Sequence, residues 1–97
     1  MPTYVMLANW TDQGMRHIEE SPKRIDAARK SLEEMGGHFI SVFVTMGEYD
    51  LIITYDAPDD AVAARFSIIL GKLGNIRTSS MKAFPEEAYR QIVHTLR

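Results

Sequence analysis

The sequence has no cysteine among its 97 residues, little net charge and no long apolar run. Without cysteine there are no disulfides, thiol nucleophiles or thiolate metal sites, which is in keeping with a reducing compartment. The formal net charge of -2 provides no basic footprint for nucleic acid or anionic lipid. No segment approaches the roughly 20 apolar residues of a transmembrane helix, and the first residues do not resemble a signal peptide. We therefore expect a cytoplasmic protein that binds neither nucleic acid nor membrane.

The length and composition are those of one globular domain. Hydrophobic residues make up 45% of the chain and charged residues 25%, and a chain of 97 residues suffices for one core but not for two. A domain this small leaves roughly a third or more of its unfolded surface exposed after folding. We therefore expect a single domain over residues 1–97, for which self-association would bury further surface.

The apolar pattern predicts four strands, at residues 3–10, 39–46, 51–55 and 75–84. Three helices are expected to begin at Ser21-Pro22, at residues 56–60 and at Pro85, with Ser21 as the N-cap of the first. Gly47 favours a tight hairpin between the two middle strands. The fourth strand has a broken alternation, which leaves its inward side unassigned.

This order of elements predicts an α+β, ferredoxin-like fold, β-α-β-β-α-β with a C-terminal helix and an antiparallel four-stranded sheet. Helices cover one face of such a sheet, yet the first three strands carry large apolar residues on both faces. The second face needs cover, most simply from the same face of another copy. We therefore expect a homodimer or a higher homo-oligomer. The alternative is that the C-terminal helix folds back over this face.

Three motifs stand out along the chain: NWTDQG at residues 9–14, SPKR at 21–24 and TMGEYD at 45–50. Together with residues 73–78 and 83–84, they resemble the GYD-domain family, named for its Gly-x-Tyr-Asp signature. The resemblance covers almost the whole chain and brings no assigned activity. It implies a ferredoxin-like fold of the dimeric α/β-barrel kind.

Residues 42–84 are also similar, more weakly, to the effector-binding domain of Lrp/AsnC-type regulators. Those domains bind small molecules such as amino acids between subunits. The DNA-binding helix-turn-helix that accompanies them has no counterpart before Thr3. This second resemblance implies a ligand-binding or oligomerisation module, although a shared fold does not by itself transfer a function.

The candidate ligand-binding residues are Trp10, Asp12, Arg16, Tyr49 and Asp50. The first three follow the end of the first strand, where an aromatic ring, a carboxylate and a guanidinium suit a ligand rim. The last two lie beside the Gly47 hairpin. Each also has a structural interpretation: Trp10 covers the core, Asp12 caps a helix, Arg16 is solvated and Asp50 accepts backbone N–H groups of the turn.

The remaining residues indicate no metal or cofactor. His17, His38 and His94 lack the spacing of a metal site, and no nucleophile motif is present. If Met1 is removed, Pro2 becomes an N-terminal secondary amine like the general base of the tautomerase superfamily, which is the most remote alternative. A proline that simply begins an edge strand is the structural interpretation.

The function expected from the sequence is an oligomeric small-molecule-binding module with a pocket near the five candidate residues. The alternative is a cofactor-free enzyme of the dimeric α/β-barrel type, resembling monooxygenases or isomerases. In such an enzyme Trp10, Tyr49 or His17 would position a substrate or move a proton. The sequence does not decide between these two classes.

Overall fold

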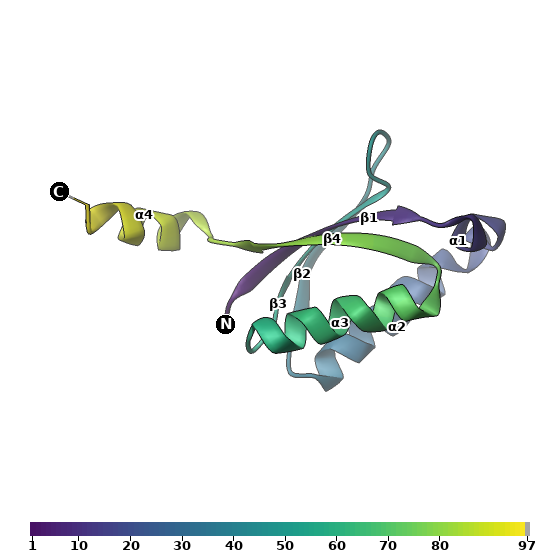
Figure 1. Cartoon of the computed structure of the whole chain (residues 1–97), viewed down its shortest axis with the longest axis horizontal. Helices are drawn as coiled ribbons and strands as arrows, with labels where there is room; N and C mark the ends of the chain where they lie inside the picture. Colours follow the sequence, from purple (N-terminus) through teal and green to yellow (C-terminus); the bar gives the residue numbers. More distant parts are fainter. Residues whose placement is uncertain (97) are drawn as a thin grey trace.

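The computed structural model describes residues 1–96, in which the four strands and the three longer helices follow the order that the sequence predicts. The elements are β1 (Thr3–Trp10), α1 (Asp12–Arg16), the 3-10 turn η1 (Ile18–Glu20), α2 (Ser21–Glu34), β2 (His38–Val44), β3 (Leu51–Asp56), α3 (Asp60–Leu73), β4 (Ile76–Ala83) and α4 (Glu86–His94). The strands form an antiparallel sheet in the order β2-β3-β1-β4, and α2 and α3 lie on one face of it (Figure 1). The predicted ferredoxin-like fold is confirmed.

The core lies between this sheet and the two helices. Because side chains alternate along a strand, β1 directs Tyr4, Met6 and Ala8 toward the helices, where all three are buried. Tyr55 of β3 stacks on Tyr4 with ring centroids 5.3 Å apart. The ring of Tyr55 also packs edge-on against Phe66 of α3, with centroids 5.3 Å apart. Aromatic pairs in these geometries contribute stability beyond the area that they bury.

Local side-chain and backbone chemistry explains both ends of α3, whereas the predicted start of α2 needs a correction. The carboxylate of Asp59 caps α3 by accepting from the N–H of Val62 at 2.9 Å, and Gly74 ends this helix at a φ of 84°. The predicted N-cap role of Ser21 is wrong. The turn η1 runs directly into α2, so Ser21 is already helical and Glu20 occupies the N-cap position without a side-chain bond.

The short helix α1 is fixed against the start of β4. Thr11, not Asp12, caps α1, and its hydroxyl accepts from the N–H of Gly14 at 3.1 Å. The N–H of Thr11 donates to the carbonyl of Asn75 at 3.0 Å. Gly14 lies so close that an added Cβ would be 2.1 Å from the same carbonyl oxygen. Only glycine therefore fits at this position without movement of the backbone.

The other face of the sheet is uncovered in residues 1–96. The strand register aligns Phe43, Ile52 and Leu7 in one row across it, and Val5 and Met81 in the next row. These five apolar side chains form what we call the open-face patch. Polar residues flank the patch, with His38 and Asp56 at one end and Asn9 and Arg77 at the other.

The register also gives the orientation of β4, which the sequence leaves open. Thr78 and Ser80 stand opposite Ala8 and Met6 and therefore face the helices. The other side of β4, with Arg77, Ser79 and Met81, belongs to the open face.

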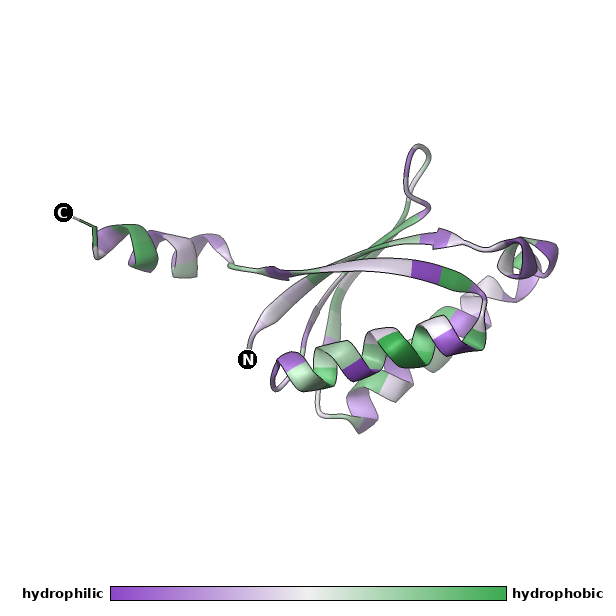
Figure 2. Ribbon diagram, viewed as in Figure 1, coloured by the Kyte–Doolittle hydropathy of each residue, from purple (hydrophilic) through white to green (hydrophobic). Residues whose placement is uncertain are grey.

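Helix α4 projects away from the body of the molecule and does not fold back over the open face (Figure 1). It is amphipathic, and Figure 2 shows both hydrophobic and hydrophilic residues along it. Its Tyr89, Ile92 and Val93 are exposed. The fold-back alternative is therefore absent from the described residues. None of the helices within residues 1–96 is both long and apolar enough to cross a membrane.

Candidate binding cavity

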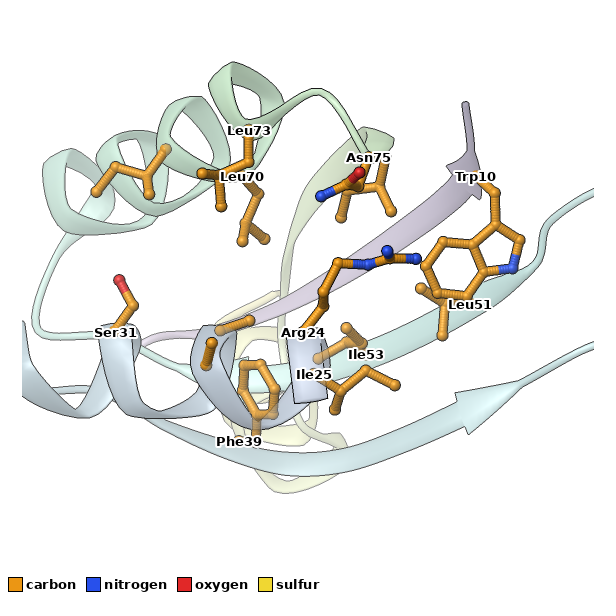
Figure 3. Close-up of a pocket in the computed structure, with 14 residues that line it drawn as sticks. Trp10, Arg24, Ile25, Ser31, Phe39, Leu51, Ile53, Leu70, Leu73 and Asn75 are labelled. Atoms are coloured by element: carbon orange, nitrogen blue, oxygen red, sulfur yellow. The ribbon is translucent and has the colours of Figure 1, made fainter. Parts of the chain in front are cut away.

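A cavity of about 310 Å³ lies between the sheet and the helices α2 and α3 (Figure 3). Its walls are mainly aliphatic and aromatic side chains from both layers. They include Ile25, Phe39, Leu51, Ile53, Ile69 and Leu70. The polar side chains of the lining are Arg24, Ser31 and Asn75, so the cavity has an apolar body and few polar groups. Small-molecule sites in proteins have volumes of about 300–1,000 Å³ and mainly apolar linings, and this cavity lies at the small end of that range.

Arg24 is the charged side chain of this lining, and α2 directs it toward Trp10. Its Nη1 donates to the carbonyl of His17 and its Nη2 to the carbonyl of Gly14, both at 3.0 Å. The guanidinium lies 5.7 Å from the centroid of the Trp10 ring, a cation–π distance. The Nε atom is buried and has no hydrogen-bond partner among the described residues. An unsatisfied buried donor costs roughly 1–3 kcal/mol.

Trp10 and Asp50 are the candidate residues that the structure brings together. The indole of Trp10 lines the cavity, and its backbone N–H donates to Oδ2 of Asp50 at 2.9 Å. The backbone of Asp50 also bonds to Ala8 and Thr45, at 2.9 and 2.8 Å. Asp50 thus fixes the hairpin to the end of β1 and supports the cavity from behind Trp10.

The other candidate residues lie outside the lining. Asp12 and Arg16 are exposed on α1. Tyr49 is half-buried in the hairpin, and its carbonyl accepts from the hydroxyl of Thr45 at 2.5 Å. A ligand contact by Asp12, Arg16 or Tyr49 therefore stays a prediction.

Sequence analysis missed Arg24 and Asn75. Arg24 precedes Ala28 by four residues on α2 and so shares a face with it. A cationic side chain that shares the inward side of a helix with a small residue can indicate a cavity lined by that cation. For Asn75, which follows the C-cap of α3, the sequence offered no comparable signal.

A separate polar cluster lies at the other end of the helix layer. The hydroxyl of Tyr4 donates to Asp60 at 2.6 Å, and Lys82 lies 3.3 Å from the same carboxylate. Burial, and then the bond to Asp60, raise the pKa of Tyr4 to about 12. The Tyr4 hydroxyl and Lys82 hold the pKa of the exposed Asp60 below its usual value. Burial raises the pKa of Tyr55 as well. These bonds tie the start of α3 to the sheet.

The histidines do not gather. His38 Nε2 lies 3.2 Å from Asp56 on the open face, whereas His17 and His94 are exposed elsewhere. Residues 1–96 contain no group of three or more metal-ligating side chains.

Comparison with known proteins shows the family of this chain. The model of the GYD domain matches residues 4–93. The chain belongs to the GYD-domain family. This GYD domain is 30% identical over 86 residues to a Thermus thermophilus protein described as a glutamine synthetase and cystathionine beta-lyase binding protein, with 88% of this chain and 90% of that protein covered.

The fold of the GYD domain is also similar to a solved structure. It matches the crystal structure of FFRP-DM1 with a TM-score of 0.62 and 21% identity, over 87% of this chain and 100% of that one. At this identity the likeness shows the fold alone.

Proposed function

We propose that this GYD domain is a homo-oligomeric binding module whose copies join through the open-face patch. The observation that carries the proposal is the uncovered apolar face, on which Phe43 is 60% exposed and Met81 47%. Monomeric proteins rarely expose contiguous apolar patches larger than a few hundred Å², and such larger patches mark interaction sites. A two-fold axis through the patch would place each apolar side chain against the same surface of the second copy.

The dimensions of the sheet indicate that its face alone makes a small interface. Four strands about 4.8 Å apart, each about seven residues long with a rise of about 3.3 Å, cover roughly 450 Å². Two copies would bury about 900 Å², less than the roughly 1,200–2,000 Å² of a stable interface. Another element has to contribute, and α4 is the one with an unpartnered apolar stripe.

We therefore include α4 in the proposed assembly. Tyr89, Ile92 and Val93 are 59%, 46% and 41% exposed, and the helix extends beyond the edge of the sheet (Figure 1). An amphipathic helix gains its stability by burying its apolar stripe against another surface. Packing on the second copy would bury this stripe and enlarge the interface.

The ligand of the proposed module is a small molecule held in the cavity. The cavity lies on the helix side of the sheet, away from the open-face patch. Assembly and ligand binding therefore occupy opposite faces of the same sheet.

Protein binding is the second candidate function, supported by the exposed stripe of α4 and by the description of the Thermus relative. An amphipathic helix can dock in a groove of a partner through residues such as Ile92. Surface-immobilised chain would then bind purified glutamine synthetase or cystathionine beta-lyase of its own host, and Ile92→Ser would weaken the binding. Equal binding by the wild type and Ile92→Ser would show that the apolar stripe of α4 does not contact the partner protein.

The assembly is tested by native mass spectrometry and light scattering of the wild type, Ile52→Lys and Ile68→Lys. Ile52 lies in the open-face patch, whereas Ile68 is 61% exposed on α3. Ile68→Lys is therefore the same substitution at a position outside the patch. We expect wild type and Ile68→Lys to form the same oligomer and Ile52→Lys to be monomeric. A monomeric wild type, or an Ile52→Lys variant that assembles normally, would contradict the proposal.

A further inference from the structure

The cavity combines an apolar body with a cation at one end. Arg24 and Trp10 lie together at that end in Figure 3, and Ser31 lies about 10 Å away along α2, at about 1.5 Å per residue. The walls between them are aliphatic or aromatic. A ligand that fills this space has to be apolar along most of its length and polar where it meets Arg24.

The contacts of Arg24 show which ligand group would complete the site. Both Nη atoms donate to backbone carbonyls, of His17 and Gly14, and these two bonds explain how Arg24 holds α1 and η1 in place. No described carboxylate forms an ion pair with Arg24. The missing component is therefore an opposite charge, which a carboxylate supplies together with hydrogen-bond acceptors.

We propose that the cavity binds a monocarboxylate with an apolar body, such as a medium-chain fatty acid, whose carboxylate pairs with the guanidinium of Arg24 at the end of the cavity. The proposal deepens the proposed binding module by naming its ligand class. At about 30 Å³ per water molecule, the cavity volume corresponds to about ten water-sized groups, which is close to the size of octanoate. A phosphate ester fits less well, because one arginine would leave much of its charge uncompensated among apolar walls.

The single tryptophan of the chain reports on binding. Because Trp10 lines the cavity beside Arg24, its fluorescence responds to a ligand that enters there. The probes are octanoate, 1-octanol and octylammonium, which share the apolar body and differ in the head group. Titration calorimetry measures the same affinities independently of the fluorescence.

We expect saturable binding of octanoate, at least tenfold tighter than that of 1-octanol and tighter still than that of octylammonium. Equal affinities for octanoate and 1-octanol would overturn the role of Arg24. No saturable signal with octanoate by either method, up to millimolar concentration, would overturn the site.

Matched variants locate the ligand. Ala28→Leu places extra atoms in the cavity while Arg24 stays intact, and we expect it to weaken octanoate binding at least tenfold. Ala64→Leu makes the same change at an exposed position of α3 outside the lining and should bind as the wild type does. Unchanged octanoate affinity in Ala28→Leu would overturn the location.

Arg24→Gln keeps a polar side chain but removes the positive charge. We expect its preference for octanoate over 1-octanol to fall toward equality, and a preserved preference would overturn the assigned contact. If this variant does not fold, the comparison of octanoate with 1-octanol in the wild type still decides.

The failure of this inference can be distinguished from a failure of the proposed assembly. Ile52 lies on the opposite face of the sheet from the cavity, so Ile52→Lys should bind octanoate as tightly as the wild type even when it is monomeric. An oligomer without octanoate binding refutes the ligand class alone. A monomeric wild type that binds octanoate refutes the assembly alone.

Discussion

Replacement of Asp50 by alanine tests whether this signature residue supports the fold or contacts a ligand. Its carboxylate accepts from the backbone N–H of Trp10 at 2.9 Å, where β1 runs beyond Ala8, the last residue that it pairs with β3. The backbone bonds of Asp50 to Ala8 and Thr45 do not involve the side chain. Asp50→Ala therefore removes the carboxylate bond and leaves the hairpin backbone able to pair as before.

The structure sets the size of the effect. Hydrogen bonds to charged groups contribute about 1.5–3 kcal/mol, and the N–H of Trp10 is only partly buried, so water can replace part of the loss. We expect Asp50→Ala to lower the free energy of unfolding by about 1–2 kcal/mol, which corresponds to a Tm lower by roughly 4–16 °C. Asp50→Asn keeps an acceptor without the charge and should lose about half as much.

Urea unfolding followed by circular dichroism and by Trp10 fluorescence measures this loss. Protein concentration is held constant, because self-association stabilises the folded state by mass action. Glu48→Ala, at the exposed part of the hairpin, is the control and should stay within about 0.5 kcal/mol of the wild type. If Asp50→Ala is as stable as this control, the carboxylate does not support Trp10, and the ligand-contact interpretation of Asp50 becomes the better one.

Gly14→Ala should lower the free energy of unfolding by about 1–3 kcal/mol in urea, because its Cβ would meet the carbonyl oxygen of Asn75 at 2.1 Å; an unchanged midpoint would show that α1 moves freely. Tyr4→Phe tests a pH dependence, since the pKa of Tyr4 is about 12 in the folded state and about 10 when unfolded. The folded state then holds the proton more tightly, so this contribution to stability is present below about pH 10 and is lost as the pH rises toward about 12. Thermal melts should show a smaller loss for Tyr4→Phe than for the wild type over this range, and parallel losses would refute the assignment.

The sequence predicted the order of elements because most of its signals are local. The apolar run of residues 3–10 marks β1, and Gly74 marks the end of α3 through its positive φ. The sequence could not orient β4, because part of its inward side is polar. Ser80 lies 3.2 Å from Ser67 of α3, and Lys82 pairs with Asp60, so polar partners on α3 replace an apolar core there.

The N-cap predicted at Ser21 failed for a related reason. Ser-Pro is a good helix start in isolation, yet η1 already supplies a carbonyl, that of Ile18, to the N–H of Ser21. Asp59 has no helical turn before it, and its carboxylate is used as a cap. Whether a capping residue acts as one thus depends on the preceding turn, which a local motif does not reveal.

The candidate site was predicted only in part, because a cavity is produced by elements distant in sequence. Trp10 comes from β1, Arg24 from α2 and Leu70 from α3, and no spacing along the chain shows that they meet. Aromatic and charged residues near turns were a sound choice for exposed ligand rims. They do not identify a cavity beneath helices, where small residues such as Ala28 leave the space.

The Gly-x-Tyr-Asp signature gains a physical explanation that connects the family to the cavity. Gly47 takes a φ of 142°, which residues with side chains rarely adopt, and the carbonyl of Tyr49 accepts from the Thr45 hydroxyl. Asp50 then closes the hairpin onto β1 through the N–H of Trp10, beside the guanidinium of Arg24. The motif therefore specifies a turn that positions the aromatic wall of the cavity.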